Sequence, residues 1–195
     1  MSRLRKYGTW ALLIGLVAAW AWMQWRDSHR EKAGKTIATR SGTGIRVIDG
    51  DSMRIGNTTV RIAGIDAPEY RQTCRDAANA EWPCGHEARA ALQRLIAAPG
   101  FACIERARDR YRRRLSDCRT NDGDVGAAMV RQGLADDARD PRFQRFAAEL
   151  AEARRAHRGI WRGPHDHPAD WRTAHPRRPR AATRVVSGEE APAGE

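Results

Sequence analysis

Apolar and polar positions alternate along two short neighbouring stretches of the chain, at residues 48–55 and 58–65. Alternation with a period of two is typical of a strand that is buried on one face only. Gly56 and Asn57 lie between the two stretches and favour a turn. The pattern therefore predicts strand, turn and strand, with Arg61 on the face opposite to its apolar neighbours.

The centre of the chain shows both helical and extended periodicity. Apolar residues recur at helical spacing in three stretches, residues 85–96, 124–134 and 141–157. Two stretches predict strands joined by a turn at 108–112, namely residues 101–105 and 113–118. Residues 70–83 are polar and predict a loop, and Phe143 and Phe146 are expected in the core. Residues 42–175 have the length of one domain with a single core.

The first 25 residues carry a different pattern. A basic segment at residues 1–7 precedes residues 8–25, which contain no charged side chain and end in a cluster of tryptophans. This span of about 18 residues approaches the ~20 that a helix needs to cross a bilayer. We expect a single transmembrane helix that acts as an uncleaved signal anchor, and a signal peptide cleaved near Ala21 stays open as the alternative. Residues 26–41 predict a juxtamembrane linker.

The positive net charge of the chain favours a negatively charged partner. Thirty-five Lys and Arg residues against 24 Asp and Glu give a net charge of +11, and nearly all the basic residues are arginine. Arginine suits bidentate contact with phosphate, so DNA or RNA is the expected partner. From Arg172 onward the chain is rich in Pro, Ala, Arg and Gly, which predicts a disordered tail at residues 176–195 that solubilises the protein or contacts anionic lipid.

Four cysteines, all in the expected domain, indicate an oxidising compartment. An even number of cysteines behind an export segment favours disulfides, and hence an extracytoplasmic location. Of the three possible connectivities we expect Cys74–Cys84, closing the loop after Glu69, and Cys103–Cys118, joining two strands. A four-cysteine metal site is the alternative, although the CxxC spacing typical of zinc is absent.

Candidate chemistry gathers at the first predicted strand pair. Asp51 and Asp66, if they converge, form a hard oxygen site suited to Ca²⁺ or Mg²⁺. Glu69 could then act as a general base toward water, and Arg61 could hold a phosphate. Each residue taken alone is equally well an ordinary turn residue. Farther along, residues 165–167 read His-Asp-His, a sparse cluster that we expect to be structural.

Four motifs occur in an order that resembles the staphylococcal nuclease (thermonuclease) family. They are VIDGDS at 47–52, VRIAGIDAPE at 60–69, DRYRRRL at 109–115 and VRQGLA at 130–135. The resemblance covers residues 44–161. It implies a five-stranded OB-type barrel with three helices, and Ca²⁺-dependent hydrolysis of DNA or RNA that cuts the P–O5′ bond and leaves 3′-phosphates. It implies no organic cofactor, and we expect a monomer.

The resemblance also implies a role for individual residues. Asp51, Asp66 and the backbone carbonyl of Ala67 match the Ca²⁺ ligands, and Asp49 matches a supporting acid outside them. The catalytic residues implied are Arg61 and Arg113, which hold the scissile phosphate, and Glu69, the general base. Arg110 and Tyr111 match positions that contact a terminal phosphate of the nucleotide.

Two departures from the family pattern bear on these roles. Arg112 stands where the family commonly has glycine, so a positive φ there would cost roughly 1 kcal/mol and could turn Arg113 away from the phosphate. The residues after Ala135 lack a tyrosine that can stack on a base. A catalytically silent nucleic-acid-binding barrel and an interaction module of the envelope are therefore the alternatives to a nuclease.

Overall fold

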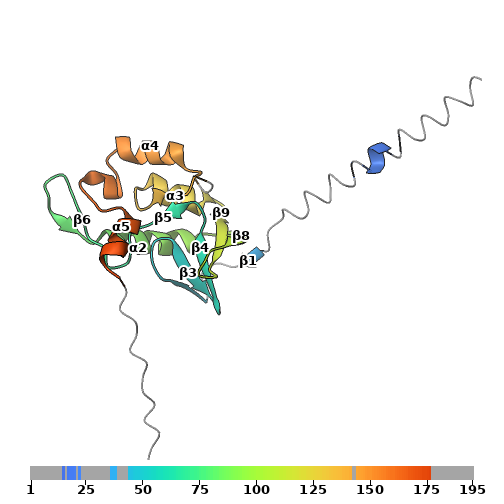
Figure 1. The fold of residues 1–195 in the computed structure, drawn as a ribbon, viewed down its shortest axis with the longest axis horizontal. Helices are drawn as coiled ribbons and strands as arrows, with labels where there is room; N and C mark the ends of the chain where they lie inside the picture. Colours follow the sequence, from blue (N-terminus) through green and yellow to red (C-terminus); the bar gives the residue numbers. More distant parts are fainter. Residues whose placement is uncertain are drawn as a thin grey trace, which may run out of the picture.

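The computed structural model describes residues 15, 17–20, 22, 36–38, 44–141 and 144–176 (Figure 1). Most of the predicted transmembrane span, residues 8–25, and all but one residue of the predicted tail, residues 176–195, lie outside this part. Among the residues that the structure describes, no helix combines the length and the apolar character that a membrane-spanning segment requires.

A mixed sheet of seven strands forms the centre of the molecule. Its strands are β1 (Thr36–Ala38), β2 (Ile45–Val47), β3 (Ser52–Ile55), β4 (Thr58–Ile62), β8 (Ala102–Arg108), β9 (Arg114–Thr120) and β10 (Gly123–Asp124). They follow the order β1-β8-β9-β4-β3-β2, with β10 paired to β9, and only β4 and β9 run parallel among these pairs. The two end strands, β1 and β2, are separated in the sequence only by residues 39–44, which fits an OB-like α+β fold.

The strand count and one boundary differ from the sequence prediction. We expected five strands, and the sheet has seven because β1 and β10 add to its edges. Strand β1 lies within residues 26–41, the predicted linker, and pairs with β8. Its three residues therefore belong to the domain, whose predicted start was residue 42.

The first predicted strand pair is confirmed as β3 and β4. Met53 and Val60 face each other across the pair and are both fully buried. Gly56 adopts a positive φ of 56°, as the tight connection requires. The strand begins later than predicted, at Ser52, because residues 48–51 form a turn whose backbone amides bond to the Ser52 carbonyl.

Two small sheets and the helices complete the fold. β5 (Ile65–Asp66) pairs with β11 (Asp136–Asp137), and β6 (Cys74–Arg75) pairs with β7 (Glu81–Trp82) within the predicted loop 70–83. The helical elements are α2 (Cys84–Ile96), α3 (Val125–Arg131), α4 (Ala147–Arg155), the 3-10 helix η1 (Gly159–Arg162) and α5 (Pro168–Ala174).

The helix prediction needs two corrections. We expected three helices in the domain, and residues 44–176 as described contain a fourth α-helix, α5, which starts at a proline with the His167 side chain capping its first turn. The predicted helix 141–157 is shorter and begins at Ala147, since residues 144–146 are not helical. Phe146 is buried as expected, while Phe143 lies outside the described residues.

Both predicted disulfides are formed, which overturns the four-cysteine metal site. Cys103 and Cys118 are directly opposite on β8 and β9. Cys74 and Cys84 close the loop that carries β6 and β7, and they form a small buried cluster with Ile160. The main core lies between the sheet and helices α2 and α3, with Leu92, Phe101 and Met129 inaccessible to solvent or nearly so.

Candidate functional site

The site is built around one guanidinium group. Arg61 lies on β4 with its side chain only 13% exposed, and its Nη1 donates a hydrogen bond to Asp51 Oδ1 at 2.7 Å. Its Nη2 lies 2.6 Å from Asp51 Oδ2 and 2.7 Å from Asp66 Oδ1. The two carboxylates therefore converge on a single cationic nitrogen, which is the condition that the sequence analysis set for a shared site.

Local sequence fixes Asp51 in this position. Asp51 directly precedes β3, in which Ser52 is the register partner of Arg61, so its carboxylate lies next to the guanidinium. Ser52 Oγ donates to Oδ1 at 2.7 Å and the Ala67 amide donates to Oδ2 at 3.2 Å. A Cβ atom on Gly50 would lie 2.7 Å from the Ala67 side chain, so only glycine allows this close approach.

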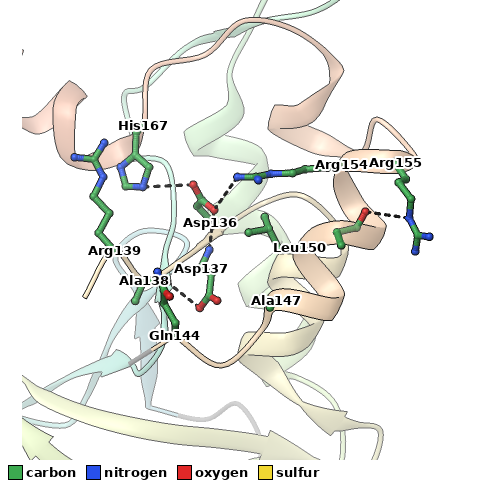
Figure 2. A pocket seen from close by; sticks show the side chains of 11 residues that line it. Asp136, Asp137, Ala138, Arg139, Gln144, Ala147, Leu150, Arg154, Arg155 and His167 are labelled. Atoms are coloured by element: carbon green, nitrogen blue, oxygen red, sulfur yellow. Dashed lines mark hydrogen bonds and ion pairs between the residues drawn. The ribbon is translucent and has the colours of Figure 1, made fainter. Parts of the chain in front are cut away.

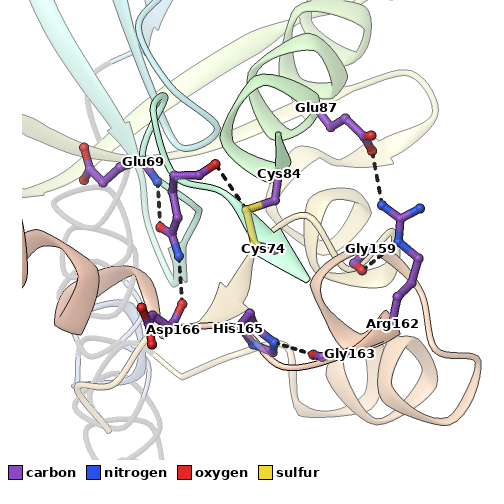
Figure 3. The surroundings of a disulfide bond; sticks show 10 residues. Glu69, Cys74, Cys84, Glu87, Gly159, Arg162, Gly163, His165 and Asp166 are labelled. Carbon is purple, nitrogen blue, oxygen red and sulfur yellow. Dashed lines mark hydrogen bonds and ion pairs between the residues drawn. A yellow bond between two sulfur atoms is a disulfide. The ribbon is translucent and has the colours of Figure 1, made fainter. Parts of the chain in front are cut away.

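Glu69 is held at the edge of the same site by its backbone. Its amide donates to Gln72 Oε1 at 3.1 Å, and the Gln72 Nε2 donates to the carbonyl of Asp166 at 2.8 Å (Figure 3). Gln72 is 1% exposed, so both ends of its amide are satisfied inside the protein. On the other side, a Cβ on Gly85 of α2 would come within 1.8 Å of the Glu69 carbonyl oxygen. These contacts fix where the carboxylate emerges.

A second arginine reaches this group from α5. Arg172 Nη1 and Nη2 each donate to Asp66, both at 3.0 Å, and Nη1 also donates to Glu69 Oε1 at 3.1 Å. Burial by itself lowers the pKa of Arg172, but its hydrogen bonds and ion pairs with the two carboxylates outweigh burial and raise it. The predicted metal ligand and the predicted base are therefore joined by one cation.

The carboxylates of the site do not share one protonation state. The pKa of Asp49 is raised to about 8. Burial is the largest cause, and the negative charge of neighbouring Asp51 is the second. Burial also acts to raise the pKa of Asp51, but Arg61 and hydrogen bonds from Asp49, Ser52 and Ala67 outweigh it and lower that pKa. At neutral pH Asp49 is thus mainly protonated and donates to an ionised Asp51.

His167 borders the site and a neighbouring cavity of about 690 Å³ (Figure 2). Its Nδ1 accepts a hydrogen bond from the Ala169 amide and lies 3.8 Å from Asp66 Oδ2, while Nε2 lies 3.4 Å from Asp136 Oδ2. Burial lowers the pKa of His167, so the ring is neutral at pH 7. The His-Asp-His stretch thus caps α5 as expected for a structural element, and it also contacts a predicted metal ligand.

Arg113 lies in a separate turn. The turn has Arg112 at φ 63°, the left-handed conformation considered from the sequence, and Arg113 Nε donates to Asp109 Oδ2 at 2.6 Å. In the described part of the chain the ion pair of Arg113 is with Asp109, and it does not join the carboxylates around Arg61. Tyr111 is 64% exposed, with the Arg110 guanidinium 4.8 Å from its ring centre.

This turn borders a cavity of its own. The cavity measures about 290 Å³ and is lined by residues 57–59 and 111–114. Burial acts to raise the pKa of Asp109, but hydrogen bonds from Arg113 outweigh it and lower that pKa. The turn therefore holds a fixed ion pair beside an open, basic surface, which is chemically suited to phosphate.

The donor set around Arg61 fits a hard cation in part. Asp51 Oδ2 and Asp66 Oδ1 lie 2.6 and 2.7 Å from the same Arg61 nitrogen, distances close to those between Ca²⁺ and its oxygen ligands. The amide of Ala67 bonds to Asp51, which brings the Ala67 backbone to the same place. However, nowhere in the described ranges do three His, Cys, Asp or Glu side chains group as ligands of one ion. Further ligands would have to be water or substrate oxygens.

Several residues of the site were missed by sequence reasoning. Arg172, Asp136 and Gln72 contact the predicted residues or anchor them, while His167 was considered only as a structural residue. Arg172 is 106 positions away from Asp66, in a stretch whose composition resembles a disordered tail, so no local pattern connects the two. Asp136 could have been found, because it follows the VRQGLA motif directly and pairs with Asp66 across β11 and β5.

Comparisons with known proteins support the resemblance. The family model described as "Staphylococcal nuclease homologue" matches residues 59–163. The succinoglycan biosynthesis protein ExoI of Rhizobium meliloti (strain 1021) is 34% identical over 123 residues, which cover 62% of this chain and 64% of that protein. The endonuclease YhcR of Bacillus subtilis (strain 168) is 30% identical over 135 residues, which cover 60% of this chain and 11% of that protein. The chain thus spans less than two thirds of each relative.

Proposed function

We propose, because the chain belongs to the staphylococcal nuclease family, that it is a nuclease that hydrolyses phosphodiester bonds of DNA or RNA. The observation that carries the proposal is the position of the Arg61 guanidinium, which is held between Asp51 and Asp66. Glu69 lies beside them, because Arg172 donates hydrogen bonds to both Asp66 and Glu69. A cation, carboxylates and a candidate base within one site are the parts that phosphoryl hydrolysis needs. One relative is itself named an endonuclease.

The proposed reaction uses Ca²⁺, for which Asp51, Asp66 and the Ala67 carbonyl would be the protein ligands. When bound, this ion would supply Lewis-acid polarisation of a phosphoryl oxygen. Glu69 takes a proton from the attacking water while the new P–O bond forms in line with the breaking P–O5′ bond. Arg61 donates to the equatorial oxygens and offsets the charge that develops on them. The 5′-oxygen leaves and takes a proton from solvent, and a 3′-phosphate remains.

We further propose that the domain acts outside the cytoplasm, held by an N-terminal membrane anchor at residues 8–25. Support comes from the length and apolar character of that segment, and from the two disulfides, which persist in oxidising compartments. DNA or RNA is the proposed partner, and we propose a monomer.

Cleavage assays on the full-length oxidised chain in detergent test the proposed activity. We expect the parent to cut single-stranded DNA or RNA with Ca²⁺ and to stop cutting with a chelator. Glu69→Gln should reduce kcat about 10²-fold or more, the scale on which a general base contributes. Arg131→Ala is the control, because Arg131 pairs with Glu149 and Glu152 away from the site. Equal rates for parent and Glu69→Gln would refute this role of Glu69.

A binding protein without catalysis is the second candidate. One observation favours it. The carboxylate oxygens of both predicted metal ligands, Asp51 and Asp66, accept hydrogen bonds from Arg61 or Arg172. It predicts salt-sensitive binding of nucleic acid with no product formed in Ca²⁺. Binding with no cleavage by the folded parent would therefore decide for this candidate.

A further inference from the structure

Helix α5 lies beyond the segment that the family model matches, which ends at residue 163. It nevertheless contributes the side chain that contacts both Asp66 and Glu69, namely Arg172. An element outside the matched segment thus forms part of the candidate site.

The docking of α5 is specified by several independent contacts. The chain before it is anchored by the bond from Gln72 to the Asp166 carbonyl and by the bond from the Arg75 amide to the Pro164 carbonyl, at 3.1 Å. Within the helix, Arg139 Nη1 donates to Asp170 at 3.0 Å. These contacts fix the chain before α5 and the first turn of the helix, and Arg172 extends into the site from the residues that follow.

Arg172 and Arg61 are neighbours through one acceptor. Both donate to Asp66 Oδ1, at 3.0 and 2.7 Å, so two guanidinium groups meet at one carboxylate oxygen. Their exposure differs, since the Arg61 side chain is 13% exposed and that of Arg172 is 37% exposed. A ligand that enters from solvent therefore meets Arg172 more readily than Arg61.

We propose that Arg172 is a substrate-binding residue, which together with Arg61 holds a backbone phosphate of the nucleic acid. In the free protein its donors rest on Asp66 and Glu69, and an incoming phosphate offers the same planar pair of oxygen acceptors. This role would otherwise fall to Arg113, whose guanidinium is paired with Asp109 in a different turn. The inference deepens the proposed nuclease function and rests on it for the identity of the ligand.

Binding measured without cleavage tests the inference directly. The probe is a fluorescent single-stranded DNA oligonucleotide, titrated with the full-length chain in chelator at several salt concentrations. Arg172→Ala should raise Kd about tenfold and reduce the slope of log K against log salt by about 0.7, the value for one phosphate contact on a single strand. Arg172→Lys, which keeps the charge but loses the fork, should recover part of the affinity.

Arg131→Ala is the matched control. Like Arg172, Arg131 is a partly exposed arginine that bonds two carboxylates, here Glu149 and Glu152, and its removal costs the same unit of charge. We expect it to change Kd less than twofold, on the order of a screened distant charge. Equal effects of the two substitutions would show that net charge alone matters, and would overturn the inference.

A further variant separates phosphate contact from the unmasking of a carboxylate. Removing Arg172 takes away one ion-pair partner of Glu69, whose charge would then repel DNA more strongly, whereas Asp66 keeps its ion pair with Arg61. In the Glu69→Gln background that charge is absent. Arg172→Ala should still raise Kd about tenfold there, which is the scale of effect expected from losing one charge-assisted hydrogen bond. Unchanged binding in this background would refute direct contact.

Cleavage distinguishes the remaining outcomes. If the parent cuts DNA, kcat/KM should fall at least tenfold in Arg172→Ala. An increase in cleavage would instead identify Arg172 as an inhibitory latch on Asp66 and would overturn the inference. If the parent binds but never cuts, the proposed nuclease function fails, whereas the binding comparison still decides the role of Arg172.

Discussion

At the scale of single residues, the site depends on balanced charge in a buried place. Asp51 is 2% exposed and ionised, a state that would be costly without its partners. Arg61, Ser52 and the Ala67 amide supply hydrogen bonds to both of its oxygens. Substitution of Arg61 would remove a phosphate ligand and would also leave this carboxylate unpaired. Stability must therefore be measured beside activity for any variant at this position.

Asp49 predicts a pH dependence of stability. Its pKa is raised to about 8 by burial and by Asp51, so the folded protein binds a proton that the unfolded chain has released. The bound proton therefore adds to the free energy of unfolding. This stabilisation is present in full below the unfolded pKa of about 4, and is lost as pH rises through 8. Asp49→Asn stays uncharged and can still donate to Asp51. We expect the variant to be more stable than the parent at pH 8, and to lack the decline between pH 4 and 8.

Urea unfolding at pH 5 and at pH 8, in chelator, measures this difference. The chelator matters because a bound cation would stabilise the ionised form of Asp49 and hide the effect. Asp122→Asn serves as the control, because Asp122 is exposed in a surface turn. Parallel pH profiles for the parent and Asp49→Asn would show that Asp49 is already ionised in the folded state.

The sequence predicted part of the site, for a physical reason. Asp51, Arg61 and Asp66 lie within 15 positions of one another, in a run of short consecutive strands and turns, so local sequence brings them together. Arg172 contacts the same oxygens across 106 positions, and that distance is closed by tertiary packing alone. The sequence raised a positive φ at Arg112 as a condition, and the structure has it, whereas no sequence pattern indicated that Arg113 would pair with Asp109.

At the scale of elements, prediction was accurate where one periodicity ran unbroken. Helix α2 lies close to its predicted range because its apolar face is continuous, whereas β3 begins four residues later and β4 ends three residues earlier than predicted. Residues 144–146 failed to continue a helix, and the Phe146 amide instead bonds to Asp137 Oδ2 at 3.3 Å. Short pairs such as β6 and β7 have two residues each, too few for a period to show.

The Cys74–Cys84 disulfide predicts a link between the loop 70–83 and the position of Glu69. The bond closes the loop that carries Gln72, and Gln72 holds the Glu69 amide. Replacing both cysteines by alanine should cost about 2–4 kcal/mol of unfolding free energy. It should also lower kcat, because Glu69 loses part of its support.

The second disulfide provides the matched comparison. Cys103–Cys118 joins β8 and β9, and its double alanine variant should lose similar stability with a smaller effect on kcat. Thermal unfolding and cleavage rates, both measured well below the melting temperature, separate the two effects. If both double variants keep the parent's kcat, the loop does not support Glu69.

At the scale of the whole molecule, two features meet in one chain. The domain is rich in arginine and closed by two disulfides, and it follows an apolar segment at residues 8–25 behind a basic start. Positive charge favours polyanions outside the cell as well as within it, so charge does not decide location. The disulfides are more informative, because cytosolic thiols are kept reduced.

Export is therefore the last prediction. We expect that an alkaline phosphatase reporter, active only after export, is active when fused at residue 43, and that the full chain sediments with membranes. All four cysteines of the chain taken from cells should resist maleimide until a reductant is added, since both pairs are bonded. Removing residues 8–25 should leave the reporter inactive and the cysteines reactive, because the chain then stays where thiols are reduced. Free thiols in the intact protein, or an inactive reporter, would place the domain in the cytoplasm and would refute the proposed cleavage of nucleic acid outside the cytoplasm.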